Sequence, residues 1–339
     1  MSEYKNILII RLSALGDVAM TLPVVYSVAV AYPNKRFTVL TRPFFARLFI
    51  NRPKNVEVLT WDLVRGCKSI PNMFALINNL EKRDFDCIAD MHNVLRSWLI
   101  DAYFIIRGKR VEMVDKMRNN RSALISSHKT KAHPNMADRY LDVFTRLGMS
   151  SALTFKSLFH NITPSHPFNI PTNSVGIAPF ARYTNKTYPI EKMERVVALL
   201  NAKQINVFLF GSKGNETNVM RQWEEKYTHC RSLAGKYNIE NELAIMSSLK
   251  VMVAMDSANQ HLAAISGARV ITIWGATTPA CGFMGYGQQK QDSICSGKKC
   301  QPCSIAGSNI CKEGTMSCLN DIQPEEIVTM IENIITSNN

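Results

Sequence analysis

Short hydrophobic runs alternate with longer amphipathic segments along most of the chain. Uninterrupted runs of this length are typical of strands buried on both faces of a parallel sheet, and the segments between them suit crossover helices. The predicted strands of the first half are 6–10, 36–41, 56–59, 86–90 and 110–113. Those of the second half are 175–178, 207–210, 232–233, 251–255 and 270–274.

The segments between these runs predict helices. In the first half the helices are 44–50, 71–82, 94–106 and 136–147, and one more follows the turn 11–17, where Pro23 marks either a first turn or a kink. In the second half they are 190–203, 216–227, 240–248, 258–266 and 324–335. This order of strands and helices predicts an α/β protein with two doubly wound parallel sheets.

A break in the alternation predicts the domain boundary. Residues 159–173 contain three prolines and polar residues without periodicity, as linkers do. A chain of 339 residues is also long for a single core. We therefore expect one domain at 1–160, a second at 174–322, and a helix within 323–339 that closes the chain.

The segment 251–267 carries the clearest candidate site. Its strand ends in Asp256 and Ser257, and a helix follows until Gly267 stops it. In open α/β sheets the carboxyl ends of the strands bind ligands, and a helix start offers unpaired amides that suit a diphosphate. The alternative is a plain helix cap with a buried histidine, His261. The segment by itself leaves both interpretations open.

Polar residues also follow two strands of the first half. Asp17 follows the first strand, in a turn whose single glycine does not make a dinucleotide fingerprint. It is either a helix cap or a carboxylate that faces a cleft between the domains. Asp90 ends another strand, and Arg96 and Ser97 begin the helix after it.

The formal net charge of +13 indicates an anionic partner, such as a nucleic acid, a membrane face or a phosphorylated substrate. The densest basic region is 107–146. Within it, 115–134 has little periodicity and predicts a surface loop that carries Arg118, Arg121, Lys129 and Lys131. No nucleic-acid-binding signature accompanies these charges, so nucleic acid is not the expected partner.

Two further features concern the compartment. No apolar run approaches the length that spans a bilayer, and the first residues lack the layout of a signal peptide, so we expect a cytoplasmic protein. Six of the nine cysteines lie between 281 and 318. A structural zinc at Cys295, Cys300, Cys303, Cys311 and Cys318 is possible in composition, but irregular spacing without a nearby histidine favours reduced thiols.

Three stretches together resemble glycosyltransferase family nine, the bacterial lipopolysaccharide heptosyltransferases. They are Arg-Leu-Ser-Ala-Leu-Gly-Asp at 11–17, Lys-Thr-Tyr-Pro at 186–189, and Asp-Ser-Ala with His-Leu-Ala-Ala at 256–264. The resemblance covers nearly the whole chain. It implies GT-B architecture, with two Rossmann-like domains facing across a cleft. It also implies inverting transfer of heptose from ADP-heptose to the inner core of lipopolysaccharide.

The resemblance implies roles for individual residues. Asp17 matches the family's catalytic base and Lys186 the lysine held against the donor diphosphate. Asp256, Ser257 and His261 match the donor-binding helix start, in which the donor-binding candidate Ala258 stands where glycine is usual. Arg11, Ser13 and Arg96 match the acceptor side. The first domain would then bind the acceptor and the second the nucleotide sugar. Tyr188 stands where the family commonly has tryptophan, which keeps an aromatic wall.

Further candidates rest on position. Glu216, at the turn 211–216, is a candidate for ribose hydroxyls or is simply a solvated glutamate at a helix start. Tyr237 is a candidate to flank the base, and His92, Arg118 and Arg121 are candidates for acceptor contacts.

The implied reaction requires a base that takes the proton of the acceptor hydroxyl, and Asp17 is favoured over Asp90 for this role. Lys186 and the amides of 257–259 can stabilise the leaving ADP, so no metal cofactor is expected. The expected partners are a nucleotide sugar and an anionic lipopolysaccharide acceptor, with peripheral contact at the cytoplasmic face of the inner membrane. Two alternatives remain, which are another nucleotide sugar as donor and a non-catalytic protein that binds nucleotides or polyanions.

Overall fold

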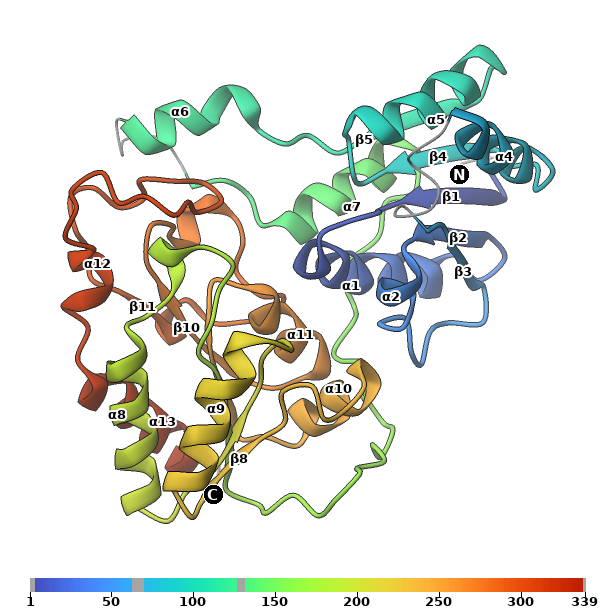
Figure 1. Cartoon of the computed structure of the whole chain (residues 1–339). Helices are drawn as coiled ribbons and strands as arrows, with labels where there is room; N and C mark the ends of the chain where they lie inside the picture. The colour runs from blue at the N-terminus through green and yellow to red at the C-terminus, as the bar shows by residue number, and fades with distance from the viewer. Residues whose placement is uncertain (1–3, 63–69, 127–131, 338–339) are drawn as a thin grey trace. The chain divides into compact units, whose positions relative to one another are not determined.

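The computed structural model describes residues 4–62, 70–126 and 132–337 (Figure 1). The chain forms two compact units. The first comprises Met1–Lys116 and Met136–Leu158, and the second comprises Met117–Asn135 and Phe159–Asn339. Each unit is built on one parallel sheet, so the predicted α/β class with two such sheets is confirmed.

The first unit has a five-stranded sheet in the order β3-β2-β1-β4-β5, and all its pairs are parallel. Its strands are β1 (Asn6–Ile10), β2 (Arg36–Thr41), β3 (Val56–Thr60), β4 (Cys87–Asp90) and β5 (Arg110–Met113). Its helices are α1 (Leu15–Ala31), α2 (Pro43–Ala46), α4 (Ile70–Glu81), α5 (Leu95–Ile106) and α7 (Met136–Arg146).

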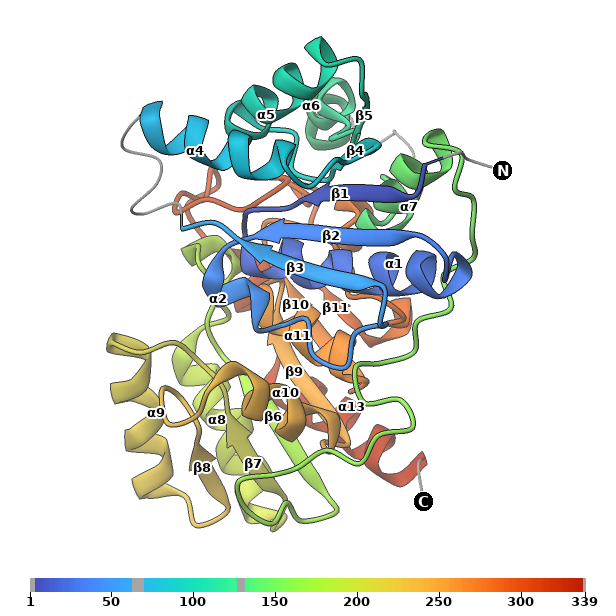
Figure 2. The same cartoon turned by 90° about the vertical axis from the view of Figure 1, so that its right-hand side faces the viewer.

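Alternate residues of β1 point to opposite faces of this sheet, because side chains alternate along a strand. Leu8 and Ile10 share a buried cluster with Ile100 of α5 and Leu80 of α4. On the other face Phe37 of β2 packs edge-on against Phe144 of α7. Helices therefore cover both faces, with α4 and α5 on one and α1 and α7 on the other (Figure 2).

The second unit has a six-stranded parallel sheet in the order β11-β10-β9-β6-β7-β8. Its strands are β6 (Ser174–Ala178), β7 (Asn206–Leu209), β8 (Cys230–Ser232), β9 (Val251–Met255), β10 (Val270–Trp274) and β11 (Ser293–Cys295). Its helices are α6 (Arg118–Ser126), α8 (Ile190–Ala202), α9 (Asn215–Lys226), α10 (Ile239–Ser247), α11 (Ala258–Ser266), α12 (Ser317–Asn320) and α13 (Pro324–Ser337), with 3-10 turns η1 (Thr184–Lys186), η2 (Pro279–Cys281) and η3 (Lys290–Asp292).

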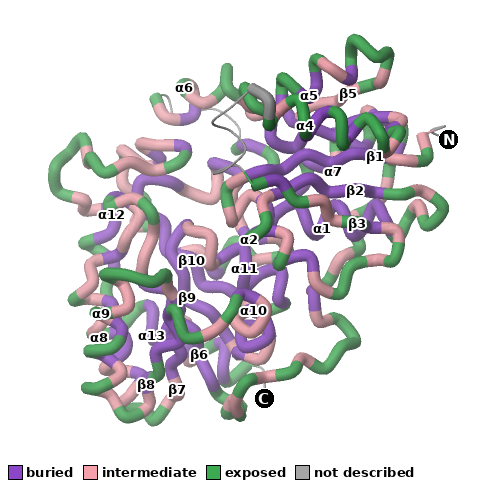
Figure 3. Tube along the Cα trace, turned by 45° about the vertical axis from the view of Figure 1, so that its right-hand side comes forward, coloured by how far each residue is buried: buried purple, intermediate pink, exposed green. Residues whose placement is uncertain are grey.

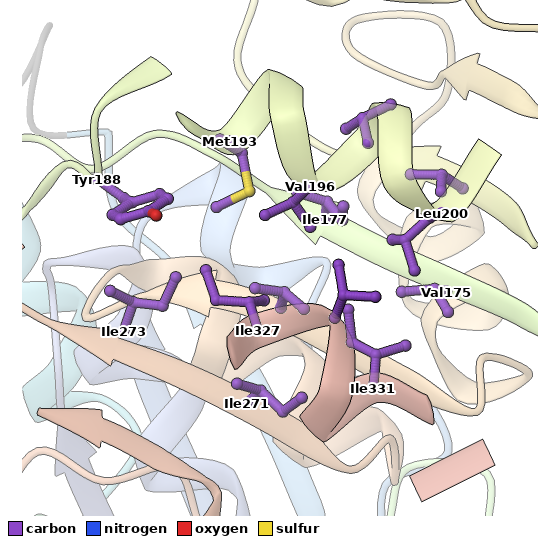
Figure 4. Packing of buried hydrophobic residues seen from close by; sticks show 14 of the residues in the cluster. Val175, Ile177, Tyr188, Met193, Val196, Leu200, Ile271, Ile273, Ile327 and Ile331 are labelled. Carbon is purple, nitrogen blue, oxygen red and sulfur yellow. The ribbon is translucent and has the colours of Figure 1, made fainter. Parts of the chain in front are cut away.

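The largest core of this unit lies beneath α8 and α13. Figure 4 shows Val196 of α8 beside Ile177 of β6, and Ile327 of α13 near Ile271 of β10, within the same cluster. Tyr188 is fully buried in the same cluster, and its hydroxyl donates to the Ile322 carbonyl at 2.9 Å. Tyr188 is therefore a core residue, which corrects the expectation of an aromatic wall. The helices α10 and α11 pack together on the opposite face, and burial in Figure 3 is concentrated along the strands.

Both sheets have a point where the strand order reverses, and such points form ligand sites in open α/β sheets. In the first sheet, β2 and β3 continue from one side of β1, and β4 and β5 lie on its other side. In the second, β7 and β8 continue from β6, while β9 begins the other half. The loops that leave β1, β4, β6 and β9 therefore occupy the positions where a site is expected.

The structure differs from the sequence expectations at four places. The predicted loop 115–134 contains the helix α6, and residues 117–135 group with the second unit although their neighbours on both sides belong to the first. Of the two positions that the sequence left open for Pro23, the structure has the one inside the helix α1. The helix expected at 44–50 is limited to the four residues of α2, and β11 was not expected. None of the described helices is long and apolar enough to cross a membrane.

Candidate active site

A buried arginine orients Asp17 in the first unit. The Arg11 side chain is 5% exposed, and its Nη2 lies 2.5 Å from Asp17 Oδ2. Its Nη1 donates to the Met91 carbonyl at 2.5 Å, and its guanidinium carbon lies 5.7 Å from the centroid of the Tyr140 ring. Burial alone would lower the pKa of Arg11, but the charges of Tyr140 and Asp17 outweigh it and raise this pKa. Arg11 thus supplies a permanent cation beside Asp17.

Asp17 also caps α1. The Ala14 amide donates to Asp17 Oδ2 at 3.2 Å, while 29% of the Asp17 side chain remains exposed. A cap and a solvent-facing carboxylate are therefore compatible at this position. An acceptor hydroxyl could reach the exposed part of the group without displacing Arg11.

His92 lies beside the same turn. Its Nε2 and the Ser13 hydroxyl are 3.2 Å apart. Burial, followed by the charge of Arg11, lowers the pKa of His92 to about 3. The imidazole is therefore neutral near pH 7 and acts as a hydrogen-bonding partner, because protonation would place a second cation beside Arg11.

Asp90 holds the loop that leaves β4. It is fully buried, and its oxygens accept from the His92 amide at 2.7 Å, the Asn93 amide at 2.9 Å and the Ser97 hydroxyl at 2.7 Å. Burial, then the neighbouring Asp90 charge, raises the pKa of Asp101 to about 9, so Asp101 is protonated at neutral pH. Because Asp90 is buried and accepts hydrogen bonds from its own loop and from α5, it positions this loop. It is unsuited to act as the base, a role that the sequence left open for it.

The structure brings some of the predicted acceptor residues together. Arg11, Ser13 and His92 form one cluster, and Arg96 is exposed at the start of α5. Arg118 and Arg121 lie on α6, which belongs to the other unit. Lys129 and Lys131 fall outside the described residues.

In the second unit, Asp256 is the centre of a buried polar cluster at the end of β9. Its Oδ2 lies 2.7 Å from Lys186 Nζ and accepts from the Thr277 hydroxyl at 2.6 Å. Its Oδ1 accepts from Gln260 Nε2 at 2.9 Å, and Gln260 Oε1 accepts from the Thr272 hydroxyl at 3.3 Å. The carboxylate is 5% exposed, so its function is to fix the ammonium of Lys186. Sequence reasoning missed Gln260 and Thr277.

Lys186 is positioned by its neighbour Asn185 in the chain and by the segment 307–308, which lies against its stem. Its neighbour Asn185 is buried, donates from Nδ2 to the Ser308 hydroxyl at 2.9 Å, and accepts from the Ser308 amide at 2.8 Å. Gly307 lies against the lysine stem, where a Cβ atom would overlap with Lys186 Cδ. The segment 307–308 therefore presses the stem toward Asp256 and leaves 12% of the Lys186 side chain exposed.

The start of α11 lies next to this pair. Ser257 is the cap residue with an extended backbone, and its hydroxyl oxygen is buried without a hydrogen-bond partner among the described residues. Ala258 and Asn259 follow at half-buried positions, and His261 is buried. The first-turn amides of a helix have no partner within the helix and carry its positive dipole end. Together with Lys186 they offer a positive charge and hydrogen-bond donors of the kind that bind an anion.

Glu216 and Tyr237 follow β7 and β8 at the same edge of the sheet. Glu216 Oε2 accepts from the Ser212 amide at 2.7 Å, so this carboxylate closes its own turn. The Tyr237 hydroxyl accepts from Arg231 at 3.2 Å, and its ring packs against Phe168 with centroids 5.7 Å apart. Both residues therefore have structural partners, and their donor roles stay predictions.

Two sets of side chains that could bind a metal have other partners or are free thiols in this structure. The Asp-x-Asp pair Asp84 and Asp86 precedes β4, at the edge opposite Asp90. Asp86 accepts from the Lys5 and Asn6 amides, and Asp84 pairs with Lys109. The five cysteines considered for zinc, which are Cys295, Cys300, Cys303, Cys311 and Cys318, are free thiols. Within the described parts of the chain, no group of three or more acidic, histidine or cysteine side chains is arranged to hold a metal ion.

Comparison with known families decides the affiliation. The sequence profile of glycosyltransferase family 9 (heptosyltransferase) matches residues 73–312. The chain belongs to this family. As a member of family 9 it is a glycosyltransferase, and the family resemblance expected from the three sequence motifs is confirmed.

Curated relatives of this family 9 chain are similar over most of their length. Lipopolysaccharide heptosyltransferase 3 of Escherichia coli is 24% identical over 286 residues, covering 77% of this chain and 81% of that protein. Lipopolysaccharide core heptosyltransferase OpsX of Haemophilus influenzae is 21% identical over 284 residues, covering 81% and 80%.

Solved structures show the same fold. E. coli heptosyltransferase WaaC with ADP superposes with a TM-score of 0.69 at 20% identity, covering 97% of this chain and 99% of that one. The glycosyl transferase family 9 protein from Veillonella parvula gives 0.75 at 17% identity, covering 98% of each chain. The family 9 chain therefore has the two Rossmann-like α/β domains of the GT-B class.

Proposed function

We propose that this glycosyltransferase moves heptose from ADP-heptose to the inner core of lipopolysaccharide, with inversion at the anomeric carbon. The observation that carries the proposal is the Lys186–Asp256 pair at the start of α11, a site built for a diphosphate. Its relatives are heptosyltransferases by name, and WaaC was solved with ADP. These names support the choice of donor and acceptor.

The donor side stabilises the leaving group. As the bond to the sugar breaks, negative charge grows on the diphosphate of ADP. Lys186 and the amides at the start of α11 offer fixed positive charge and hydrogen-bond donors to it. Because Asp256 is occupied by Thr277 and Gln260 as well, it holds the ammonium in place without needing to move. A cation of the chain thus supplies the charge, and we propose that no metal is required.

The acceptor side supplies the base. Asp17 takes the proton from the attacking hydroxyl as that oxygen bonds to the anomeric carbon. Arg11 fixes the orientation of Asp17 through the 2.5 Å contact. Neutral His92 and Ser13 beside it provide hydrogen-bonding groups for the acceptor sugar. In this proposal the enzyme works at the cytoplasmic face of the inner membrane, where its lipid-linked acceptor is exposed.

A panel of nucleotide sugars tests the donor. A ligand that binds the folded chain raises its melting temperature, so ADP-heptose should raise it more than ADP-glucose, GDP-mannose or UDP-glucose. The chain should then release ADP when heptose-free lipopolysaccharide is added, and chelator should not slow the release. Anomeric configuration, read by NMR of the product, tests inversion. Stabilisation by ADP-heptose without any transfer would instead indicate a nucleotide-binding protein, and preference for another sugar would identify a different transferase.

A further inference from the structure

The helix α5 buries Ile100 and Phe104 in the core and also carries apolar residues on its outer side. Ser97 and Asp101 are buried against the sheet, beside Asp90 of β4. The side chains of Leu95 and Ile106 are 70% and 84% exposed. An ordinary surface helix turns one apolar stripe to the core and is polar on its outer side, whereas α5 has apolar residues on both sides.

The exposed face of α5 is continuous. Its residues occupy one side of the helix, because they recur at positions i, i+3, i+4, i+7 and i+11, which are Leu95, Trp98, Leu99, Ala102 and Ile106. Contiguous exposed apolar surface of this kind marks an interaction site. On the same side of the sheet, α4 adds Phe74, which is 60% exposed.

The charges around this face select its partner. Arg96 lies within the exposed half of α5, and Arg107, which follows its last residue, is exposed and pairs with Glu81 of α4 at 2.7 Å. All residues of α5 are described, and its one acidic residue, Asp101, is buried. Docking against a second copy of the same face would bring these arginines together. An anionic lipid surface would pair with them while taking up the apolar side chains.

The dimensions fit a helix that lies in a bilayer interface. Twelve residues give a helix of about 18 Å, well short of the roughly 30 Å hydrocarbon core. Tryptophan is enriched at such interfaces. We propose that the exposed face of α5 docks this enzyme on an anionic bilayer, with Leu95, Leu99 and Ile106 in the headgroup–acyl boundary. This rests on the proposed function in that it identifies the surface that reaches a membrane-embedded acceptor.

The arrangement also links docking to the candidate site. Ser97 of α5 donates to Asp90, and Asp90 holds the amides of His92 and Asn93. The buried Ser97 of α5 therefore supports the loop that carries His92. The Ser97–Asp90 hydrogen bond fixes the rotation of α5 about its own axis, so the helix keeps the same face toward the lipid.

Trp98 offers a direct measurement. The chain has four tryptophans, and Trp61, Trp223 and Trp274 are buried while Trp98 is 40% exposed. Vesicles of phosphatidylethanolamine and phosphatidylglycerol should shift the emission to the blue, and brominated lipids should quench it. The Trp98→Phe variant should lose both responses. Unchanged emission of the wild-type chain with anionic vesicles would overturn the proposal, as would an equal response to purely zwitterionic vesicles.

A matched pair of variants tests the surface. Leu95→Ser, Leu99→Ser and Ile106→Ser together should weaken partition onto the anionic vesicles more than tenfold in a flotation assay. The control changes three exposed apolar residues elsewhere, Val30→Ser, Phe44→Ser and Ile162→Ser, and should partition like wild type. Equal loss of vesicle binding in both variants would show that any exposed apolar residue contributes, and that the α5 face is not a specific docking surface. Retained binding by the α5 variant, or a wild-type dimer that this variant alone dissociates, would assign the face to something other than lipid.

The last measurement separates this inference from the proposed reaction. Vesicle binding needs neither donor nor acceptor, so it is tested even if heptose is not the sugar transferred. If transfer occurs, the α5 variant should keep kcat/KM for a delipidated core oligosaccharide and lose about tenfold for acceptor embedded in vesicles. Equal loss on both acceptors would mean that the substitutions disturb the site and not docking.

Discussion

At the scale of single residues, each unit contributes one candidate carboxylate, and the two differ in exposure. Asp17 meets Arg11 and still keeps part of its surface in solvent, whereas Asp256 is enclosed by Lys186, Thr277 and Gln260. A base must exchange protons with substrate, and a group that only fixes a cation need not. The difference in exposure therefore assigns the two acids different tasks.

Asp17→Asn should abolish most transfer while ADP binding stays near wild type. The amide keeps the size of the side chain but cannot accept the proton, and general bases contribute about 100- to 10,000-fold to rates. Turnover with excess acceptor and ADP binding by calorimetry measure the two effects. Full turnover by this variant would remove Asp17 from the mechanism.

Lys186→Ala should weaken donor binding and slow the chemical step together. Its ammonium opposes the diphosphate both in the bound donor and in the leaving group, so kcat/KM for the donor should fall roughly 100-fold. Asp256→Asn is the companion variant, because it keeps the lysine and removes the carboxylate that fixes it. If Lys186→Ala moved only the KM of the acceptor, the donor assignment would be wrong.

Asp101→Asn should stabilise the chain at alkaline pH. The pKa of Asp101 is raised to about 9 by burial and by Asp90, so the folded state keeps a proton that the unfolded state has lost. Stability linked to this group is fully present below about pH 4 and falls as the pH rises toward 9. The amide removes this loss, so the gain should exceed about 1 kcal/mol at pH 8 and vanish near pH 4.

Urea unfolding at a series of pH values measures this gain. The control is Asp138→Asn, an exposed aspartate at the start of α7, which should keep the wild-type pH slope. A parallel shift of Asp101→Asn at every pH would contradict a buried proton on Asp101.

At the scale of elements, a glycine in an irregular segment lies against the stem of Lys186, the lysine proposed to bind the donor. Gly307 has a φ of +91° and touches the stem of Lys186. Gly314 has a φ of +70°, and no atom lies within 4 Å of the place that a methyl group would take there. Both would carry similar backbone strain as alanine. Only one would displace the lysine.

Gly307→Ala should therefore raise the Kd for donor about tenfold, since the new methyl group would overlap with Lys186 Cδ and push the ammonium away from Asp256. Gly314→Ala should lose a comparable amount of stability and bind donor normally. Melting temperatures and donor titrations of both variants make the comparison. Equal donor affinity in the two variants would show that the Lys186 side chain can move away from the new methyl group without weakening donor binding.

Element by element, the hydrophobic pattern predicted β1, β2, β9 and β10 with the bounds that the structure has. It could not predict α6, because that helix buries only Leu124, which packs against Cys281 and Ile305 far along the chain. The motifs predicted that Lys186, Asp256 and the start of α11 belong to one site, and the structure places them together. Thr277, which donates to Asp256, was not predicted. It lies just after β10, which neighbours β9, and side chains at the carboxyl ends of adjacent strands are expected to come together.

At the scale of the whole molecule, the net charge of +13 affects how the protein associates with charged partners more than how it folds. Reversing Arg118 and Arg121 to glutamate should raise the KM for an anionic acceptor and flatten its dependence on salt, because screening acts over roughly 10 Å at 0.1 M. Donor affinity should hardly change.

The matched control for these reversals is Lys54→Glu with Lys290→Glu, which changes the net charge equally at exposed positions away from α6. Initial rates between low and high salt distinguish the two pairs of substitutions. Identical acceptor kinetics in both would show that the charge of α6 has no specific part in binding.

The grouping of residues 117–135 with the second unit bears on how relatives of this enzyme could exchange parts. The chain passes between its two units at 116–117, at 135–136 and at 158–159. A recombinant joined once within the linker would take Leu124 from one parent and its partners Cys281 and Ile305 from the other, and the His133 amide would meet a foreign carbonyl in place of Ala280. Productive hybrids should therefore need three junctions, so that the inserted helix is inherited with the half of the chain on which it packs.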